Sequence, residues 1–367
     1  MENKERLRSN VRINELINLN KHLSDRFKIV DNMYEYTISS IQDFEKIINL
    51  LQNELSKKFN YLKLFYRGME EKKGETWEIL PSLAFNNMVK YENELVMSFL
   101  HKKPSDFANM EDNFEMIAKM QHFGLPTRIL DFSLNPYIAL YFATENNEDN
   151  YGKVIIHLNK LDTLDSKYTK QIFFSFYNIT AKDYDYCQEI IEKNGIDFVM
   201  DNDYVFLDKL LDFNKKAFVK YLFNNYYHYN CITMCSPKYY TERERNQQSV
   251  FMIFANELYD FQQKHILKSD NIEEIINAEK DCSQVDNINN RFIPKPKIKA
   301  LTEEQLKHDF LIIKIPKKLK VKIKKYLNNI GIKNSFIYPE LNYVAKDIIK
   351  EVKEIRDHGE ESCNKTE

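Results

Sequence analysis

Apolar residues recur at three- and four-residue spacing in several stretches of the chain, and this spacing predicts amphipathic helices. The firmest of these begins near Ser39 and Ser40, where serine supplies an N-cap. Its apolar face consists of Ile41, Phe44, Ile47, Ile48, Leu51 and Leu55. Similar patterns predict helices from about Asn87 to Phe99, from about Asn113 to Gly124 and from Pro136 onward.

Glycine, asparagine and proline mark where two of these helices end or begin. Gly124 provides the positive φ with which many helices stop, and Pro126 prevents continuation. Asn135 is placed to cap the next helix, and Pro136 occupies its first position, where a missing N–H is tolerated. The residues that follow are almost all apolar, so we expect this helix to be buried.

Short β-branched and aromatic runs predict strands between the helices. They cover Tyr61 to Tyr66, Lys153 to Leu158, Val250 to Phe254 and Phe310 to Ile315. The first run stops at Arg67-Gly68, so Arg67 is expected at a strand end. We therefore predict an α+β fold with a single domain, in which a small mixed sheet is flanked by helices.

The polar stretches divide the chain into three parts. Residues 1–35 are highly charged and weakly periodic, which predicts a helical extension outside the main core. Residues 36–355 form the expected domain, and within it 269–299 read as a polar, mobile excursion, because apolar residues are sparse and Pro294 and Pro296 occur there. Residues 356–367 are expected to be a disordered tail. The sequence between Lys317 and Ile355 predicts a helix, a turn at Gly331, an extended piece and a final helix.

Composition narrows the class of protein. The 367 residues are 43% hydrophobic and 29% charged, with 53 basic and 55 acidic side chains, so a soluble globular chain is expected and no global field favours nucleic acid or an anionic membrane. No apolar run approaches the roughly 18 residues that span a bilayer. The charged N-terminus shows no secretory pattern and the five cysteines form no disulfide frame, which together predict a cytoplasmic location.

Several common functional motifs are missing from the sequence. There is no glycine-rich phosphate loop, no Gly-x-Ser-x-Gly elbow and no His-Glu-x-x-His helix. Cys231 and Cys235 lie near His228, but a second ligand pair at suitable spacing is absent, so we expect no metal site. The alternating lysines from 317 to 325 are more typical of a solvated helix face than of a nucleic-acid groove.

Four segments, in order, resemble the bacterial FRG domain, a family named for its (Phe/Tyr)-Arg-Gly motif. They are Phe65-Tyr66-Arg67-Gly68; Leu80-Pro81-Ser82-Leu83; the long run from Gln121 to Pro136, continuing through Ala139 to Ala143; and Arg243 to Phe251. A C-terminal match, Gly331-Ile332 and then Ser335 to Leu341, extends the similarity over roughly residues 40 to 350. The family is generally described as a domain of unknown function, so the resemblance implies a family and not a reaction.

The Tyr66-Arg67-Gly68 motif is the first candidate for a binding site. A guanidinium beside open glycine backbone suits bidentate capture of a phosphate or carboxylate. The motif also looks like the first catalytic strand of arginine-type ADP-ribosyltransferases, a likeness that implies that Arg67 would hold the dinucleotide. The alternative is a buried structural pair between Arg67 and a carboxylate such as Asp131.

A second candidate group lies at the turn after the predicted helix that ends at Gly124. Gln121 and His122 occupy the last turn of that helix, and Thr127, Arg128 and Asp131 follow it. Such a polar run between apolar helices is typical of a cleft. His122 could act as an acid or base, or could cap its own helix. Arg128 and Asp131 are three apart and are expected to form a local salt bridge that fixes the loop.

A third candidate group is the entry to the strand that starts near Ser249. Arg243, Gln247 and the nearby Glu242 and Glu244 could face a ribose in a transferase. Such enzymes need a carboxylate to stabilise an oxocarbenium-like state, and Gln247 does not provide one. Glu242 is therefore the candidate carboxylate. The alternative is a polar strand entry on the rim of a sheet.

These observations leave three hypotheses. In the first, the protein is a nucleotide-binding, ADP-ribosyltransferase-like or NAD-cleaving enzyme, with NAD as substrate and no certain cofactor. In the second, it is a ligand-sensing or protein-interaction module without turnover. In either of these two hypotheses, the protein could act in bacterial defence or in a toxin system. In the third, the motifs only hold the fold together through buried ion pairs.

Overall fold

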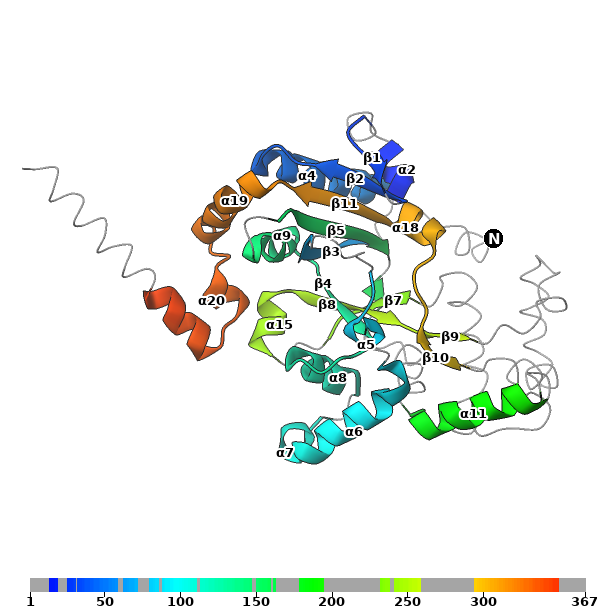
Figure 1. Cartoon of the computed structure of the whole chain (residues 1–367). Coiled ribbons are helices and arrows are strands. Elements are labelled where there is room, and N and C mark those ends of the chain that lie inside the picture. The colour runs from blue at the N-terminus through cyan, green and yellow to red at the C-terminus, as the bar shows by residue number, and fades with distance from the viewer. Residues whose placement is uncertain are drawn as a thin grey trace, which may run out of the picture.

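The structure of the chain is a computed structural model (Figure 1). It describes residues 13–18, 25–30, 32–58, 62–71, 79–85, 88–110, 113–146, 150–159, 161–162, 178–194, 232–237, 241–258 and 294–349. Helices and strands are mixed, which confirms the α+β class. The main sheet is larger than expected, because nine strands join it.

The main sheet has the strand order β1-β2-β11-β5-β3-β4-β8-β7-β6. Its strands are β1 (Lys28–Val30), β2 (Met33–Thr37), β3 (Lys63–Glu70), β4 (Ile129–Ser133), β5 (Gly152–Asn159), β6 (Leu161–Asp162), β7 (Ile232–Cys235), β8 (Ser249–Phe254) and β11 (Phe310–Ile315). Neighbours pair antiparallel, except that β2 with β11 and β6 with β7 are parallel. A second, two-stranded sheet joins β9 (Asn256–Leu258) to β10 (Pro294–Ile298).

Helices cover both faces of this sheet. The labelled helical segments are α2 (Ile13–Asn18), α4 (Ile41–Lys58), α5 (Ser82–Phe85), η1 (Val89–Tyr91), α6 (Glu92–Lys102), α7 (Pro104–Phe107), α8 (Asn113–His122), α9 (Pro136–Glu145), α11 (Ala181–Asn194), α15 (Glu242–Asn246), α18 (Glu303–Asp309), α19 (Lys317–Asn329) and α20 (Asn334–Ile337). Residues 341–349 are also helical. One hydrophobic cluster joins α2, α4, α9 and α19 to one face of β3, β5 and β11.

The sheet changes direction between β3 and β4. These two strands share a single registered pair, Tyr66 with Ser133, whereas β3 pairs with β5 along its whole length. Figure 1 shows β11, β5 and β3 in the upper part of the molecule and β8 and β7 in the lower part. A second hydrophobic cluster contains Phe65 from the upper part and Leu130 and Met252 from the lower part, so both parts pack on the same core.

Gly68 allows helix α9 to lie directly on strand β3. A Cβ at this position would stand 1.7 Å from the carbonyl oxygen of Ala139 and 2.7 Å from the backbone nitrogen of Ala143. No side chain fits at such distances, so glycine is required here by close packing. Gly152, on the neighbouring strand β5, has the same relationship to α9, with 2.2 Å to the carbonyl oxygen of Ala143.

Most of the helix and strand predictions are confirmed to within a few residues. The strand Phe310–Ile315 has the expected bounds, Gly124 has a φ of +89°, and Asn135 caps α9 by accepting a hydrogen bond from the backbone N–H of Tyr137. None of the helices in the described ranges is long and apolar enough to cross a membrane.

The N-terminal and C-terminal parts differ from expectation. Ile13, Leu16 and Ile17 are buried in the main hydrophobic cluster, so the expectation that this helix lies outside the core was wrong. Residues 334–337, expected to be extended, form the short helix α20. Residues 294–298 form β10. Residues 269–293 and the predicted tail lie outside the described residues.

Candidate functional site

A cavity of about 250 Å³ lies where β3 and β4 stop pairing. Its walls come from β3, α8, β4, α9, α15 and β8. The lining residues are Tyr66, Arg67, Gly68, Ala118, Gln121, His122, Asp131, Phe132, Ser133, Ile138, Ala139, Phe142, Arg243, Glu244, Gln247, Ser249 and Phe251. The cavity therefore brings together three groups of candidates that are far apart in the sequence.

Arg67 lies within β3 and not at its end, because the strand continues to Glu70. Its side chain is half-buried and donates a hydrogen bond of 2.7 Å from Nη1 to the backbone carbonyl of Asp131. Burial lowers the pKa of Arg67, and the nearby charge of Asp131 partly offsets this shift. An arginine remains protonated at neutral pH despite such a shift, so Arg67 places a positive charge on the cavity wall.

A short chain of hydrogen bonds fixes the opposite wall. Nε2 of Gln121 donates to Oδ1 of Asp131 at 2.7 Å, and the hydroxyl of Thr127 donates to Oε1 of Gln121. Gln121 and Asp131 line the cavity, whereas Thr127 is buried behind them and does not. Thr127 therefore orients Gln121. It was a candidate for binding a ligand, but it does not line the cavity.

Helix α15 supplies the third wall. It starts with a capping box, in which Thr241 and Glu244 exchange side-chain and backbone hydrogen bonds. The box buries Glu244, so the carboxylate on the cavity wall is Glu244, whereas Glu242 is exposed and does not line the cavity. Arg243 and Gln247 do line it. The expectation that Glu242 faces the site was therefore wrong.

His122 stands at the end of α8, between the cavity and the C-terminal part of the chain. Its Nε2 is 3.5 Å from Oε1 of Glu340, and the same oxygen is 3.6 Å from Nη1 of Arg243. Burial is the main reason that the pKa of His122 lies below its usual value. Arg243 lowers this pKa further, while Glu340 opposes the shift. His122 is therefore biased toward the neutral form, which can accept a proton.

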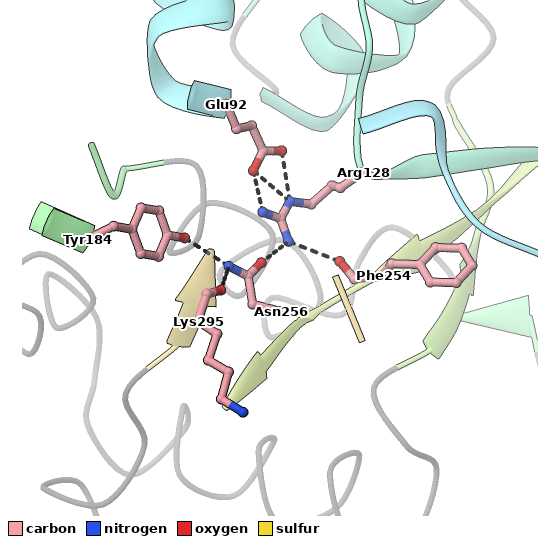
Figure 2. Close-up of polar contacts among 6 residues, drawn as sticks. All are labelled: Glu92, Arg128, Tyr184, Phe254, Asn256 and Lys295. Carbon is pink, nitrogen blue, oxygen red and sulfur yellow. Dashed lines mark hydrogen bonds and ion pairs between the residues drawn. The ribbon is translucent and has the colours of Figure 1, made fainter. Parts of the chain in front are cut away.

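Arg128 has a different role from the one expected. Its guanidinium pairs with both carboxylate oxygens of Glu92 and donates to the carbonyl of Phe254 and to Oδ1 of Asn256, each at 3.0 Å (Figure 2). Arg128 is fully buried and does not line the cavity. The predicted salt bridge between Arg128 and Asp131 was wrong, because Asp131 lies beside Arg67 and Gln121 instead.

Tyr66 connects the motif strand to the helical layer. It is buried, and Nε2 of Gln52 on α4 donates a hydrogen bond of 3.2 Å to its hydroxyl oxygen. Burial raises the pKa of Tyr66 to about 12. Tyr66 is thus a neutral residue of the cavity wall at physiological pH, and Gly68 contributes through packing against α9.

Sequence reasoning did not select Glu340 or Tyr338 as site residues. The guanidinium of Arg243 lies over the ring of Tyr338 at 4.5 Å. Both residues belong to the segment Ser335 to Leu341, whose resemblance to the FRG domain was the available signal. Phe142 was also missed, because an apolar side chain on a helix predicts only burial.

The cavity offers anion-binding groups and carboxylates but no metal-ligand set. Among the residues that the structure describes, no group of three or more His, Cys, Asp and Glu side chains is arranged to hold a metal ion. Cys235 is buried, and Cys231 and His228 lie outside the described residues. Arg67, Arg243 and His122 are the groups that suit an anionic ligand.

Comparison with known proteins finds one family model that matches part of the chain. The model of the FRG domain matches residues 62–152, a range that includes Arg67, His122 and Asp131. Helix α15 and Glu340 lie outside the matched range. The searches of curated proteins and of solved structures found no match.

Proposed function

Since the chain carries an FRG domain over residues 62–152, with the motif arginine on a cavity, we propose that this cavity binds a phosphorylated small molecule of the NAD class. The observation that carries the proposal is the pair of guanidinium groups of Arg67 and Arg243 on two walls of one cavity. Guanidinium groups bind phosphate oxygens with paired, charge-assisted hydrogen bonds. Two of them on one cavity suit a pyrophosphate better than a single carboxylate.

Arg67 is well placed to hold a phosphate. Its hydrogen bond to the carbonyl of Asp131 uses one N–H of the guanidinium and fixes the plane of the group. A donor whose orientation is fixed in advance loses less conformational entropy when a ligand binds. Gly68 next to it keeps that part of the wall free of a side chain.

For catalysis, we assign the carboxylate to Glu244. Cleavage of NAD breaks the bond between the ribose and the nicotinamide nitrogen, and the electron pair leaves with nicotinamide. The ribose then carries oxocarbenium character, which a nearby carboxylate stabilises. Thr241 holds Oε2 of Glu244 through its backbone N–H and its hydroxyl. Water attacks the oxocarbenium carbon, and His122 accepts the proton that the water releases.

The test is a comparison of two neighbouring glutamates. Purified wild type, Glu244→Gln and Glu242→Gln are incubated with NAD, and free nicotinamide is measured by chromatography and mass spectrometry. Glutamine also serves in a capping box, so Glu244→Gln keeps the helix start. We expect release by wild type and by Glu242→Gln, and a loss of at least about 100-fold in Glu244→Gln. Equal release by both variants would refute this role of Glu244.

A sensor without turnover is the second candidate. The observation that favours it is that Glu244 also serves to cap α15, so its burial has a purely structural explanation. In this case the wild type binds ADP-ribose, as measured by calorimetry, and releases no nicotinamide from NAD. Binding without release would therefore support the cavity and remove the catalytic assignment.

A further inference from the structure

Residues 334–340, named here the C-terminal strap, lie against α9 and α15, two helices that line the cavity. Figure 1 shows α20, the first part of the strap, beside α15 on the same side of the molecule as α9. Nδ2 of Asn246 donates to the carbonyl of Phe336 at 2.8 Å, and Nε2 of Gln247 donates to the carbonyl of Ile337 at 3.1 Å. These bonds join the strap to the helix that carries Arg243 and Glu244.

The strap is joined to α9 by two more side-chain hydrogen bonds. The hydroxyl of Tyr338 donates to Oε2 of Glu145, and the hydroxyl of Tyr141 donates to Oδ1 of Asn334, both at 3.1 Å. The strap thus bridges two helices that line the cavity. These four contacts are polar, whereas Ile337 between them is fully buried in the main hydrophobic cluster and anchors the middle of the strap. Polar contacts exchange with water at lower cost than a packed apolar interface, so movement is confined to the C-terminal end of the strap, residues 338–340.

Glu340 holds the strap only loosely to His122 and Arg243, two residues that line the cavity. Its Oε1 is 3.5 Å from His122 and 3.6 Å from Arg243, distances at which an ion pair forms but a good hydrogen bond does not. Its Oε2 is shielded from solvent and has no hydrogen-bond partner among the described residues. The side chain as a whole keeps 39% exposure. These contacts therefore contribute little to the stability of the strap in its present position.

Resting on the proposed function, we propose that Glu340 is an internal counter-ion that occupies the place of a ligand phosphate at Arg243, and that nucleotide binding displaces it together with the end of the strap, residues 338–340. A phosphate brings more oxygens and more charge to a guanidinium than a carboxylate does. The ligand therefore replaces a long ion pair with short, bidentate bonds. The orphaned Oε2 returns to water when the strap moves, which removes an unsatisfied buried group.

Arg243 is the principal cation in this exchange. Burial and the charge of Arg243 keep the pKa of His122 below its usual value, which disfavours the charged form of this histidine. Arg243 is also held by the ring of Tyr338 in the strap. Movement of the strap would therefore free Arg243 from its carboxylate and from its aromatic contact together.

The experiment measures the binding of ADP-ribose by calorimetry to wild type, Glu340→Gln and Glu242→Gln at pH 7. Glu242→Gln removes the same charge from the neighbour of Arg243 but touches neither the strap nor the cavity, so it reports the long-range electrostatic effect alone. We expect Glu340→Gln to bind about tenfold more tightly than wild type, and Glu242→Gln to change the affinity less than about twofold.

A second measurement follows the strap itself. Hydrogen exchange of the amides of Tyr338 and Glu340, at the end of the strap, is expected to become faster in wild type when ADP-ribose binds. Unchanged or weaker binding by Glu340→Gln, or slower exchange in the strap, would overturn the inference. If binding depends on Arg67, as tested with Arg67→Lys, but not on Glu340, only the inference fails. If neither the wild type nor any variant binds ADP-ribose, the inference and the proposed function both fail.

Discussion

The guanidinium of Arg67 reaches across the opening between β3 and β4 and donates a 2.7 Å hydrogen bond to the backbone carbonyl of Asp131. The two strands have only the pair Tyr66 and Ser133 in register. A side chain therefore provides a link where the backbone ladder has ended. The same opening is the site of the cavity, so the arginine both joins the two parts of the sheet and lines the cavity.

Replacing Arg67 with lysine tests this double role. Lysine keeps the charge but lacks the planar fork, so we expect Arg67→Lys to weaken ADP-ribose binding at least about tenfold. Loss of the bond to Asp131 should also lower the free energy of unfolding by about 1 kcal/mol. Calorimetry and urea unfolding measure the two effects. Arg245→Lys, on the exposed side of α15, is the control that should change neither. Unaltered ADP-ribose binding by Arg67→Lys would contradict the assignment.

Gly68→Ala is expected to be one of the most harmful small substitutions in the protein. The new Cβ would lie 1.7 Å from the carbonyl oxygen of Ala139, which is helix backbone and has little freedom to move. We expect a loss of about 3 kcal/mol or more in the free energy of unfolding. Gly124→Ala has open space around it and only its φ of +89° to strain it, so it should cost about 1 kcal/mol. Similar urea midpoints for both variants would show that α9 can shift away from β3.

The buried pair of Arg128 and Glu92 should behave as a structural contact (Figure 2). Arg128→Met leaves the carboxylate of Glu92 buried without its partner, and we expect a loss of about 3 to 5 kcal/mol. The double variant Arg128→Met with Glu92→Leu should recover much of that loss, because no charge is then buried. Lys57→Met, which removes an exposed ion pair with Glu54, is the control and should cost less than about 1 kcal/mol.

The same variants test whether the pair of Arg128 and Glu92 also affects ADP-ribose binding. Any variant of Arg128 that remains folded should retain ADP-ribose binding, since Arg128 does not line the cavity. A folded Arg128→Met protein that no longer binds ADP-ribose would show that the network of Figure 2 also positions the cavity.

Acid should destabilise the protein through His157. This side chain is buried and stacks on Phe310 at 4.2 Å, and burial lowers its pKa to about 4. Its Nδ1 lies near the carbonyl oxygen of Asp309, which can only accept a hydrogen bond, so Nδ1 carries the hydrogen. Nε2 then accepts a hydrogen bond from Nδ2 of Asn159. The neutral form is thus the one that the fold prefers.

The sign of the effect follows from the two pKa values of His157. In the unfolded chain this residue titrates near 6.5. Between that pH and about 4, the unfolded state therefore binds a proton at His157 and the folded state does not. The stability contribution is complete above about pH 6.5 and is lost as the pH falls through about 4, by an amount of the order of 3 kcal/mol. Urea unfolding at pH 7 and pH 4.5 should show this loss in wild type and a smaller loss in His157→Gln. An equal loss in both proteins would assign the acid sensitivity to other groups.

Local sequence signals were sufficient for much of the secondary structure. The end of α8 at Gly124 and the start of α9 at Asn135 and Pro136 depend on backbone conformations and caps that neighbouring residues decide. Hydrophobic periodicity likewise depends only on residues within the same helix or strand. These features were predictable because their physical causes lie within a few residues of one another.

The partners of the polar side chains were decided by tertiary structure. Arg128 has Asp131 three residues away, yet it pairs with Glu92 on a distant helix, because the two are buried together and a buried guanidinium needs a complete set of acceptors. Glu242 and Glu244 are nearly equivalent in sequence, and only the direction of α15 against the sheet places Glu244 on the cavity.

The sequence alone determined that the Arg67 motif and the segment from Gln121 to Pro136 belong to one family match, and it predicted that the segment starting at Arg243 belongs with them. Tertiary structure decided that these segments meet at a single cavity where β3 and β4 separate, and that Glu340 closes in on it from the C-terminal strap. The physical reason is that the position of a strand break and the choice of ion-pair partner depend on which surfaces are buried together, and this is a property of the folded chain.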